Sequence, residues 1–132
     1  WPPEAHHASG GGHSFLLPWV VGVLGEGPAG DIFGGWFMAQ MDLAAGNTAA
    51  RIARGRSATV AVDGIQFLKP VSVGDEVTLF AELESVGRTS MRIQVEAWRR
   101  ARDGDETEKV TEALFTFVAL DQDGRPRPIP DR

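Results

Sequence analysis

Residues 30–42 read GDIFGGWFMAQMD and pass from a glycine-rich loop into a helical pattern that is apolar on almost every side. A helix without a polar face is normally buried, so the pattern predicts a central helix from about Gly35 to Arg54. Asp42 is the one carboxylate within that helix. A buried carboxylate resists ionisation unless hydrogen bonds or charges support it. Asp42 is therefore predicted either to have a structural role that lowers the stability of the fold or to take part in the chemistry of the protein.

The composition narrows the class of protein. The chain has 132 residues, enough for one domain, with 18 acidic and 13 basic residues and no cysteine. The acidic balance argues against a general binder of nucleic acids or membrane surfaces, whose charge would be basic. The lack of cysteine excludes disulfides and thiol nucleophiles and fits a cytoplasmic protein. The longest apolar run, residues 15–24, is shorter than the roughly 20 residues needed to span a bilayer.

Elsewhere in the chain, apolar and polar residues alternate with a period of two, as they do in strands. Turn residues separate the strands predicted at 15–24, 58–68, 76–84, 91–97 and 110–120. We predict a mobile N-terminal tail at 1–14, a single domain at 15–124 and a C-terminal tail at 125–132. One strand, one helix and four strands predict an α+β fold, in which a curved antiparallel sheet of about five strands wraps around the helix. One chain would leave the helix half covered and the sheet edges open, so a two-fold partner that extends the sheet is expected.

Four blocks, in order, carry a family resemblance. They are GDIFGGWFMAQMDLA at 30–44, GRSATVAVDGIQFLKPVSVGDEV at 55–77, GRTSMRIQVEAW at 87–98 and VTEALFTFVALDQDGRPRPIP at 110–130. A single glycine turn would carry no weight, because such turns occur everywhere. Together the blocks resemble the hot-dog fold acyl-CoA thioesterases, and among them the short bacterial acyl-CoA hydrolases of the YciA type.

The resemblance implies a hot-dog homodimer, often assembled further into a trimer of dimers, that hydrolyses acyl-CoA to coenzyme A and a carboxylic acid. It implies no metal and no organic cofactor. In this family the site lies at the dimer interface, where an acidic residue on one helix faces the glycine loop of the other subunit. Asp42 matches the acidic residue, and Asp31, Gly34 and Gly35 match the loop. The chain departs from the family at 25–29, where relatives commonly carry an asparagine.

The residues themselves suit thioester hydrolysis. Asp42 would act as a general base on water or as a nucleophile. Small side chains leave space beside it, at Ala39, Ala45, Gly46 and Ala49. The alternative interpretation is structural: the small residues permit close packing, and Asp42 bonds to backbone amides.

Thioester hydrolysis also needs groups that stabilise the negatively charged carbonyl oxygen, the oxyanion, and the start of the helix offers a place for it. Backbone amides near Gly34, Gly35 and Trp36 would be free, and the helix dipole favours negative charge there. The two glycines also suit a tight loop that needs unusual backbone angles. Asp31 is a good helix cap, and we assign it mainly to capping or bracing the loop.

Coenzyme A carries phosphates, so an acidic protein needs local cations to bind it. The candidates are Arg56, Lys69, Arg88, Arg99 and Arg100, with Arg88-Thr89-Ser90 as the first choice because it joins a cation to two hydroxyls. For any one of them, a surface ion pair is the simpler interpretation. The acyl chain would lie against Phe33, Trp36, Phe37 or Met41, unless these are plain core residues.

Other functions fit less well. His6, His7 and His13 lie in a glycine-rich stretch without acidic or cysteine neighbours, so no metal site is predicted. No G-x-S-x-G elbow is present, which argues against an α/β-hydrolase. A hot-dog dehydratase or hydratase would need a histidine, and none follows residue 13. The main alternative is a non-catalytic module that binds or senses acyl-CoA.

Overall fold

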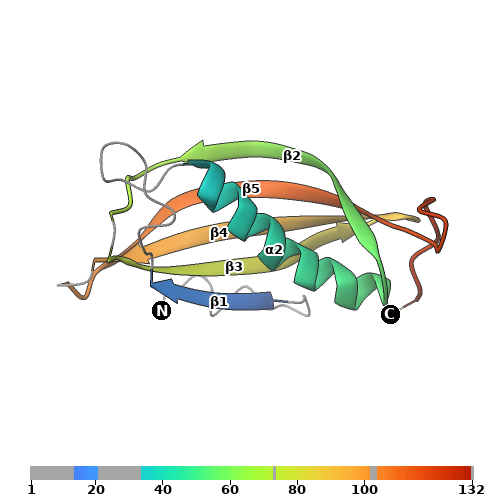
Figure 1. The fold of residues 1–132 in the computed structure, drawn as a ribbon, viewed down its shortest axis with the longest axis horizontal. Coiled ribbons are helices and arrows are strands. Elements are labelled where there is room, and N and C mark those ends of the chain that lie inside the picture. Colours follow the sequence, from blue (N-terminus) through green and yellow to red (C-terminus); the bar gives the residue numbers. More distant parts are fainter. Residues whose placement is uncertain (1–13, 21–33, 73, 102–103, 132) are drawn as a thin grey trace.

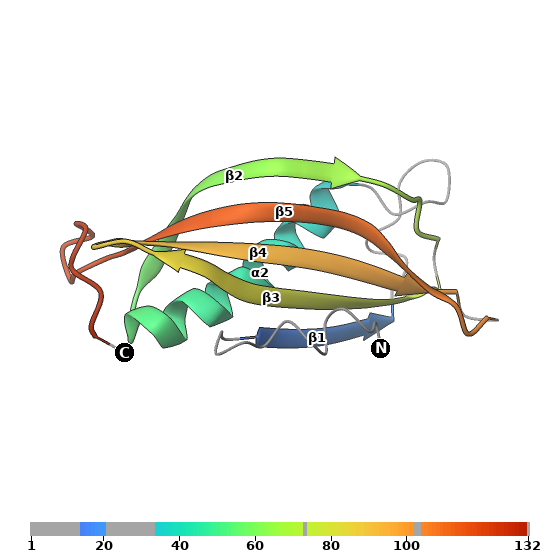
Figure 2. The ribbon, with the colours of Figure 1, turned by 180° about the vertical axis from the view of Figure 1, so that it is seen from behind.

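The structure, a computed structural model, describes residues 14–20, 34–72, 74–101 and 104–131. Strand β1 (Ser14–Val20) is followed by helix α2 (Gly34–Ala53) and by β2 (Ser57–Phe67), β3 (Glu76–Val86), β4 (Ser90–Arg100) and β5 (Thr107–Ala119). The strands form one five-stranded sheet in the order β1-β3-β4-β5-β2, and each neighbouring pair is antiparallel. The sheet curves around α2 (Figures 1 and 2). The predicted α+β architecture is confirmed.

The predicted elements lie close to the observed ones. The helix begins and ends one residue earlier than predicted, and the last three strands extend two or three residues beyond their predicted ends on at least one side. Residues 21–24 of the first predicted strand, the three histidines and Asp31 lie outside the described residues. No helix within the described ranges is long and apolar enough to cross a membrane.

One face of α2 packs on the sheet. Its buried side chains include Phe37, Met41, Ala45, Ala49 and Ile52, which join one core with the inward residues of the strands, among them Leu79, Met91, Ile93, Val95 and Phe115. Each large apolar side chain buried in this way contributes about 1.5–3 kcal/mol. The alanines are fully buried, which allows the helix backbone to approach the strands closely.

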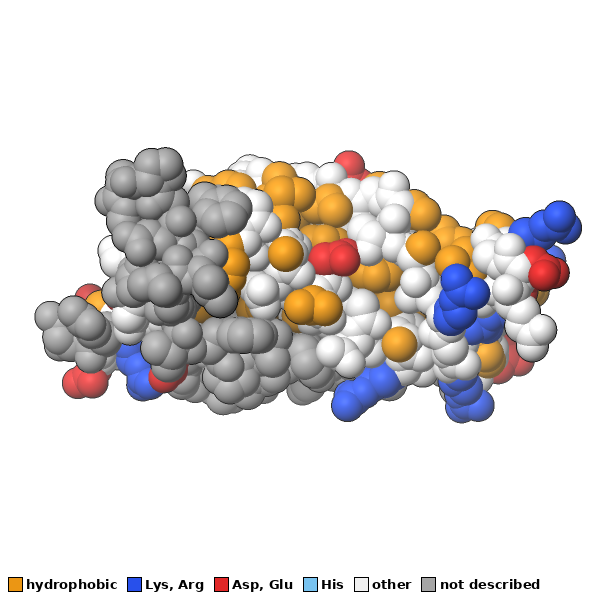
Figure 3. Space-filling model, in the orientation of Figure 1, with side chains coloured by type: hydrophobic (Ala, Val, Ile, Leu, Met, Phe, Trp, Pro, Cys, Tyr) orange, Lys and Arg blue, Asp and Glu red, His pale blue; other side chains and the backbone are white. Residues whose placement is uncertain are grey.

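The opposite face of α2 is open in the single chain. Met38 is 40% exposed and Leu43 is 58% exposed. Figure 3 shows hydrophobic side chains at the surface on this helix-bearing side of the molecule. One chain therefore covers only half of the apolar helix, as the sequence predicts.

Strand β2 forms one edge of the sheet. Within the described residues it pairs only with β5, and the register shifts between Thr59 and Ala61 and again between Asp63 and Gln66. Val60, at the first shift, is 58% exposed. An apolar edge strand with free backbone groups is a site where a further strand can pair.

The predicted C-terminal tail folds back onto the domain. Leu120 and Pro126 form an isolated β-bridge, and the amide of Ile129 donates to the carbonyl of Arg88 at 2.8 Å. The guanidinium of Arg127 donates to the carbonyls of Ala53 at 2.7 Å and Leu120 at 2.9 Å. This segment therefore supplies one donor to the end of α2, where the last carbonyls lack partners within the helix.

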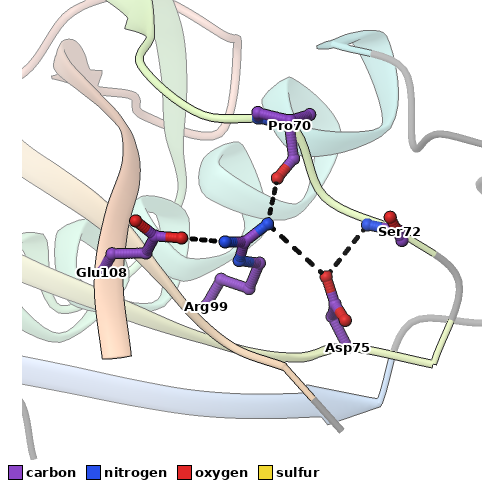
Figure 4. A network of polar contacts seen from close by, with 5 residues as sticks. All are labelled: Pro70, Ser72, Asp75, Arg99 and Glu108. Atoms are coloured by element: carbon purple, nitrogen blue, oxygen red, sulfur yellow. Dashed lines mark hydrogen bonds and ion pairs between the residues drawn. The ribbon is translucent and has the colours of Figure 1, made fainter. Parts of the chain in front are cut away.

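Arg99 fastens the loop between β2 and β3 (Figure 4). Its guanidinium donates to the carbonyl of Pro70 at 2.6 Å and pairs with Glu108 and, at 3.9 Å, with Asp75. Asp75 in turn accepts a bond from the amide of Ser72 at 3.0 Å. Arg100 is also engaged, with Glu76 at 2.8 Å. Two of the cations considered for binding phosphate are thus used to hold the fold.

Candidate active site

Asp42 connects the helix to the edge strand. Its Oδ1 atom accepts a hydrogen bond of 2.5 Å from the hydroxyl of Thr59, which stands on β2. The side chain of Asp42 is half-buried rather than enclosed in the core. The burial predicted for this carboxylate is therefore not provided by one chain alone.

A groove of about 520 Å³ opens beside this carboxylate. The second half of α2, the start of β2 and one ring from β5 line it, with the residues Asp42, Leu43, Gly46, Asn47, Ala50, Gly55, Arg56, Ser57, Thr59 and Phe117. Both polar groups of the Asp42–Thr59 pair therefore face a space large enough for part of a ligand.

The small residues around Asp42 have separate roles. Gly46 lines the groove, and a Cβ atom placed there would lie 3.8 Å from the Phe117 ring. Ala45 and Ala49 do not line the groove and are fully buried in the core. The glycine therefore makes room beside the carboxylate, whereas these two alanines serve packing.

The start of α2 is too far from Asp42 to share a small ligand with it inside one chain. Gly35 precedes Asp42 by seven residues, which places them about 10 Å apart along the helix axis. A carbonyl oxygen bound by an amide and a carbon attacked beside Asp42 must both lie within about 3 Å of their protein groups. Amides that serve the Asp42 of this chain must therefore come from elsewhere.

The predicted binding residues fall at two opposite ends of the domain. Arg88, Thr89 and Ser90 lie where α2 ends, since the carbonyl of Thr89 accepts from the amide of Ala119, which pairs with Ser57. Lys69 follows the far end of β2. That end meets the start of α2, where the Phe37 and Phe67 rings lie 6.4 Å apart. Gly34, Gly35 and Trp36 share the Lys69 end.

Sequence reasoning missed Thr59. Threonine is common in strands because its branched side chain suits them, so its place in β2 carries no signal of chemistry. Its role depends on which helix residue lies opposite, and only the packing of α2 against β2 reveals that.

One titratable group with a shifted pKa lies away from this groove. Glu82 stands on β3 between Ala81, which is in the core, and Leu83, which packs against the core, so its side chain points to the sheet face opposite the helix. Burial, and secondarily the nearby charge of Glu96, raises the pKa of Glu82 above its usual value.

Comparison with known proteins agrees with the fold. Residues 29–104 match the family described as the Thioesterase superfamily. An uncharacterized acyl-CoA thioester hydrolase from Zymomonas mobilis is 56% identical over 101 residues, which are 76% of this chain and 68% of that protein. The acyl-CoA thioester hydrolase YciA of Salmonella typhimurium is 48% identical over 104 residues, covering 76% and 78%.

Solved structures give the same result. The crystal structure of a hexameric thioesterase from Yersinia pestis superposes with a TM-score of 0.85 at 42% identity. The match covers 89% of this chain and 96% of that one.

Proposed function

This chain belongs to the thioesterase superfamily, and we propose that it hydrolyses acyl-CoA thioesters to free coenzyme A and a carboxylic acid, with Asp42 as the reacting carboxylate. The observation that carries the proposal is the Asp42–Thr59 pair at the side of the groove. Its substrate class follows from relatives about half identical that bear the name acyl-CoA thioester hydrolase. Because coenzyme A thioesters are made and used inside cells, a cytoplasmic location forms part of the proposal.

The chemistry needs one base and one oxyanion site. As a general base, Asp42 takes a proton from water while the water oxygen attacks the thioester carbonyl carbon. The resulting tetrahedral intermediate then expels the thiolate of coenzyme A, which takes up that proton as the carbon–sulfur bond breaks. In a nucleophilic variant the Asp42 carboxylate attacks the carbonyl carbon and displaces the thiolate of coenzyme A, which forms a mixed anhydride. Water then hydrolyses this anhydride to the free carboxylic acid and restores Asp42, and a proton from that water neutralises the thiolate. In both routes the Thr59 hydroxyl holds one carboxylate oxygen in place.

A two-fold partner completes the site. If β2 pairs antiparallel with the partner's β2, the start of one strand lies beside the end of the other. The start of β2 borders the groove, and its end lies beside the start of α2. The partner's helix N-terminus then comes to the groove with the free amides that an oxyanion needs. The same pairing brings the partner's Lys69 and Trp36 towards Arg88, Thr89 and Ser90.

Assembly beyond the dimer forms part of the proposal. The Yersinia pestis relative is hexameric, and a trimer of dimers is the symmetric way to build six subunits from two-fold pairs. We assign Asp31 mainly to capping the helix or bracing the glycine loop.

A chain-length series tests the function. Purified protein is incubated with acyl-CoAs from acetyl to long-chain, and the released thiol is measured. Turnover with at least part of the series is expected. Tight binding without turnover at any chain length would favour the non-catalytic acyl-CoA module instead.

Thr59 is proposed as a positioning residue, so Thr59→Val is expected to lower kcat by roughly 10- to 100-fold, because a hydrogen bond to a charged group contributes about 1.5–3 kcal/mol. The KM for acyl-CoA should change little. Thr59→Ser keeps the hydroxyl and should restore most of the rate, which a purely packing role would not explain. Equal rates for Thr59→Val and the unaltered protein would remove Thr59 from the mechanism.

A further inference from the structure

One cation lines the same groove as Asp42. Arg56 lies between the end of α2 and the first residue of β2, and its side chain is exposed. Among the residues that the structure describes, no ion pair or hydrogen bond engages its guanidinium. Arg99 and Arg100, in contrast, are bound to carboxylates that hold the fold. Arg56 is therefore an available charge at a ligand-sized groove.

Arg56 lies at the far end of the groove from the chemistry. It precedes Thr59 by three residues, which corresponds to about 10 Å along an extended chain. Thr59 marks the position of the Asp42 carboxylate through their hydrogen bond. The groove thus offers a carboxylate at one point and a guanidinium some distance away, an arrangement that suits a ligand with a reactive carbonyl and a remote anion.

Further cations surround this end of the domain. Arg51 and Arg54 are exposed at the end of α2, and Figure 3 shows Lys and Arg side chains gathered there. Arg127 lies against Gly55, since a Cβ atom on that glycine would come within 2.9 Å of the guanidinium. Its bonds go to carbonyl groups, and within the described part of the chain no carboxylate pairs with it. Among the described residues that follow β5, the acidic ones are Asp121, Asp123 and Asp131. The Asp121 carboxylate accepts from backbone amides.

We propose that Arg56 binds the phosphates of the 3′-phospho-ADP part of coenzyme A, with Arg51, Arg54 and Arg127 adding positive potential around it. The inference rests on the proposed function and specifies which end of the substrate lies where. The guanidinium fork matches phosphate oxygens in pairs, and the pantetheine arm spans the distance from Arg56 to Asp42. Because the chain as a whole carries a net charge of −5, this local potential decides where a polyanion binds.

The test compares two substrates that differ only at the anionic end: an acyl-CoA and the same acyl group on pantetheine, which lacks the 3′-phospho-ADP part and so all the phosphates. Arg56→Gln is expected to lower the ratio of kcat/KM for acyl-CoA over the truncated thioester by roughly tenfold or more, mainly through KM. In the unaltered protein, added salt should raise the KM for acyl-CoA more than the KM for the truncated thioester.

Arg92→Gln is the matched control. Arg92 is exposed on β4 between the buried residues Met91 and Ile93, so it lies on the sheet face away from the helix. The Arg92→Gln variant loses the same charge without altering the groove. Its ratio of kcat/KM for acyl-CoA over the truncated thioester should equal that of the unaltered protein. Equal ratios for Arg56→Gln and Arg92→Gln, with both variants folded by circular dichroism, would overturn the assignment. If the unaltered protein hydrolyses neither substrate, the proposed function itself fails, which is a separate result.

Discussion

Asp42→Asn is expected to lower the kcat of acyl-CoA hydrolysis by about 10²- to 10⁴-fold, the range that a general base contributes. Asparagine has nearly the same shape, and its carbonyl oxygen can still accept the hydrogen bond that Thr59 donates at 2.5 Å. The fold and the association state should therefore survive, whereas the ability to take up a proton or to attack a carbonyl is lost. Steady-state release of thiol from several acyl-CoAs measures the effect.

A matched control separates charge from chemistry. Asp105→Asn removes one negative charge from an exposed position between β4 and β5 and should leave kcat within twofold of the unaltered protein, in keeping with the small effect of most surface changes. If Asp42→Asn retained the kcat of this control, Asp42 would be a structural carboxylate and the proposed mechanism would be wrong.

Val60→Asp is expected to separate the two-fold pair and to lower kcat/KM by at least roughly 10²-fold, the loss typical of removing one oxyanion donor. Val60 is 58% exposed on β2 at a shift in the strand register. A charge on an edge strand opposes pairing with a second strand, so the partner's helix start would no longer reach the groove. Sedimentation velocity and the rate of hydrolysis, measured at the same protein concentrations, report both effects.

Val60→Thr serves as its control, because threonine keeps the branched shape that strands favour and adds no charge. This variant should associate and turn over normally. A dissociated Val60→Asp protein with full activity would show that one chain contains the whole site. A Val60→Asp protein that stays associated would place the interface between the subunits on a different part of the surface.

Much of the fold could be predicted because its signals are local. The apolar pattern of residues 35–54 and the alternation in the strands each depend on neighbours within a few residues, and they located the elements to within a few positions. The C-terminal segment shows where such signals end. A stretch with three prolines resembles a tail, yet Arg127 bonds to the end of α2. A contact between residues more than seventy positions apart cannot be predicted from the periodicity of the sequence.

The site could be predicted only in part for the same reason. Asp42 stands out because a carboxylate in an apolar helix is rare, and small residues beside it indicate space. The neighbours of Asp42 across the groove depend on how α2 crosses β2, which brings Thr59 to the carboxylate and Arg56 to the same cavity. By residue type alone, Arg99 is a candidate for binding phosphate. In the structure, however, its guanidinium is bound to the carbonyl of Pro70 and the carboxylate of Glu108.

The central claim is that each site combines the carboxylate of one chain with the helix start of another, and mixing two inactive variants tests it directly. One variant is Asp42→Asn. The other is Gly35→Pro, which deletes an amide in the first turn of α2, where proline is tolerated. In a mixed pair, one of the two sites would carry both changes and the other would carry neither.

Random reassociation of equal amounts should therefore restore roughly a quarter of the unaltered activity, because half of the pairs are mixed and half of their sites are intact. Thiol release is measured before and after the two proteins are dissociated and reassembled together. Recovery to about that level is the result we predict. Activity that stays at the sum of the two separate variants, in a sample shown to contain mixed pairs, would mean that each chain acts alone and would contradict the account.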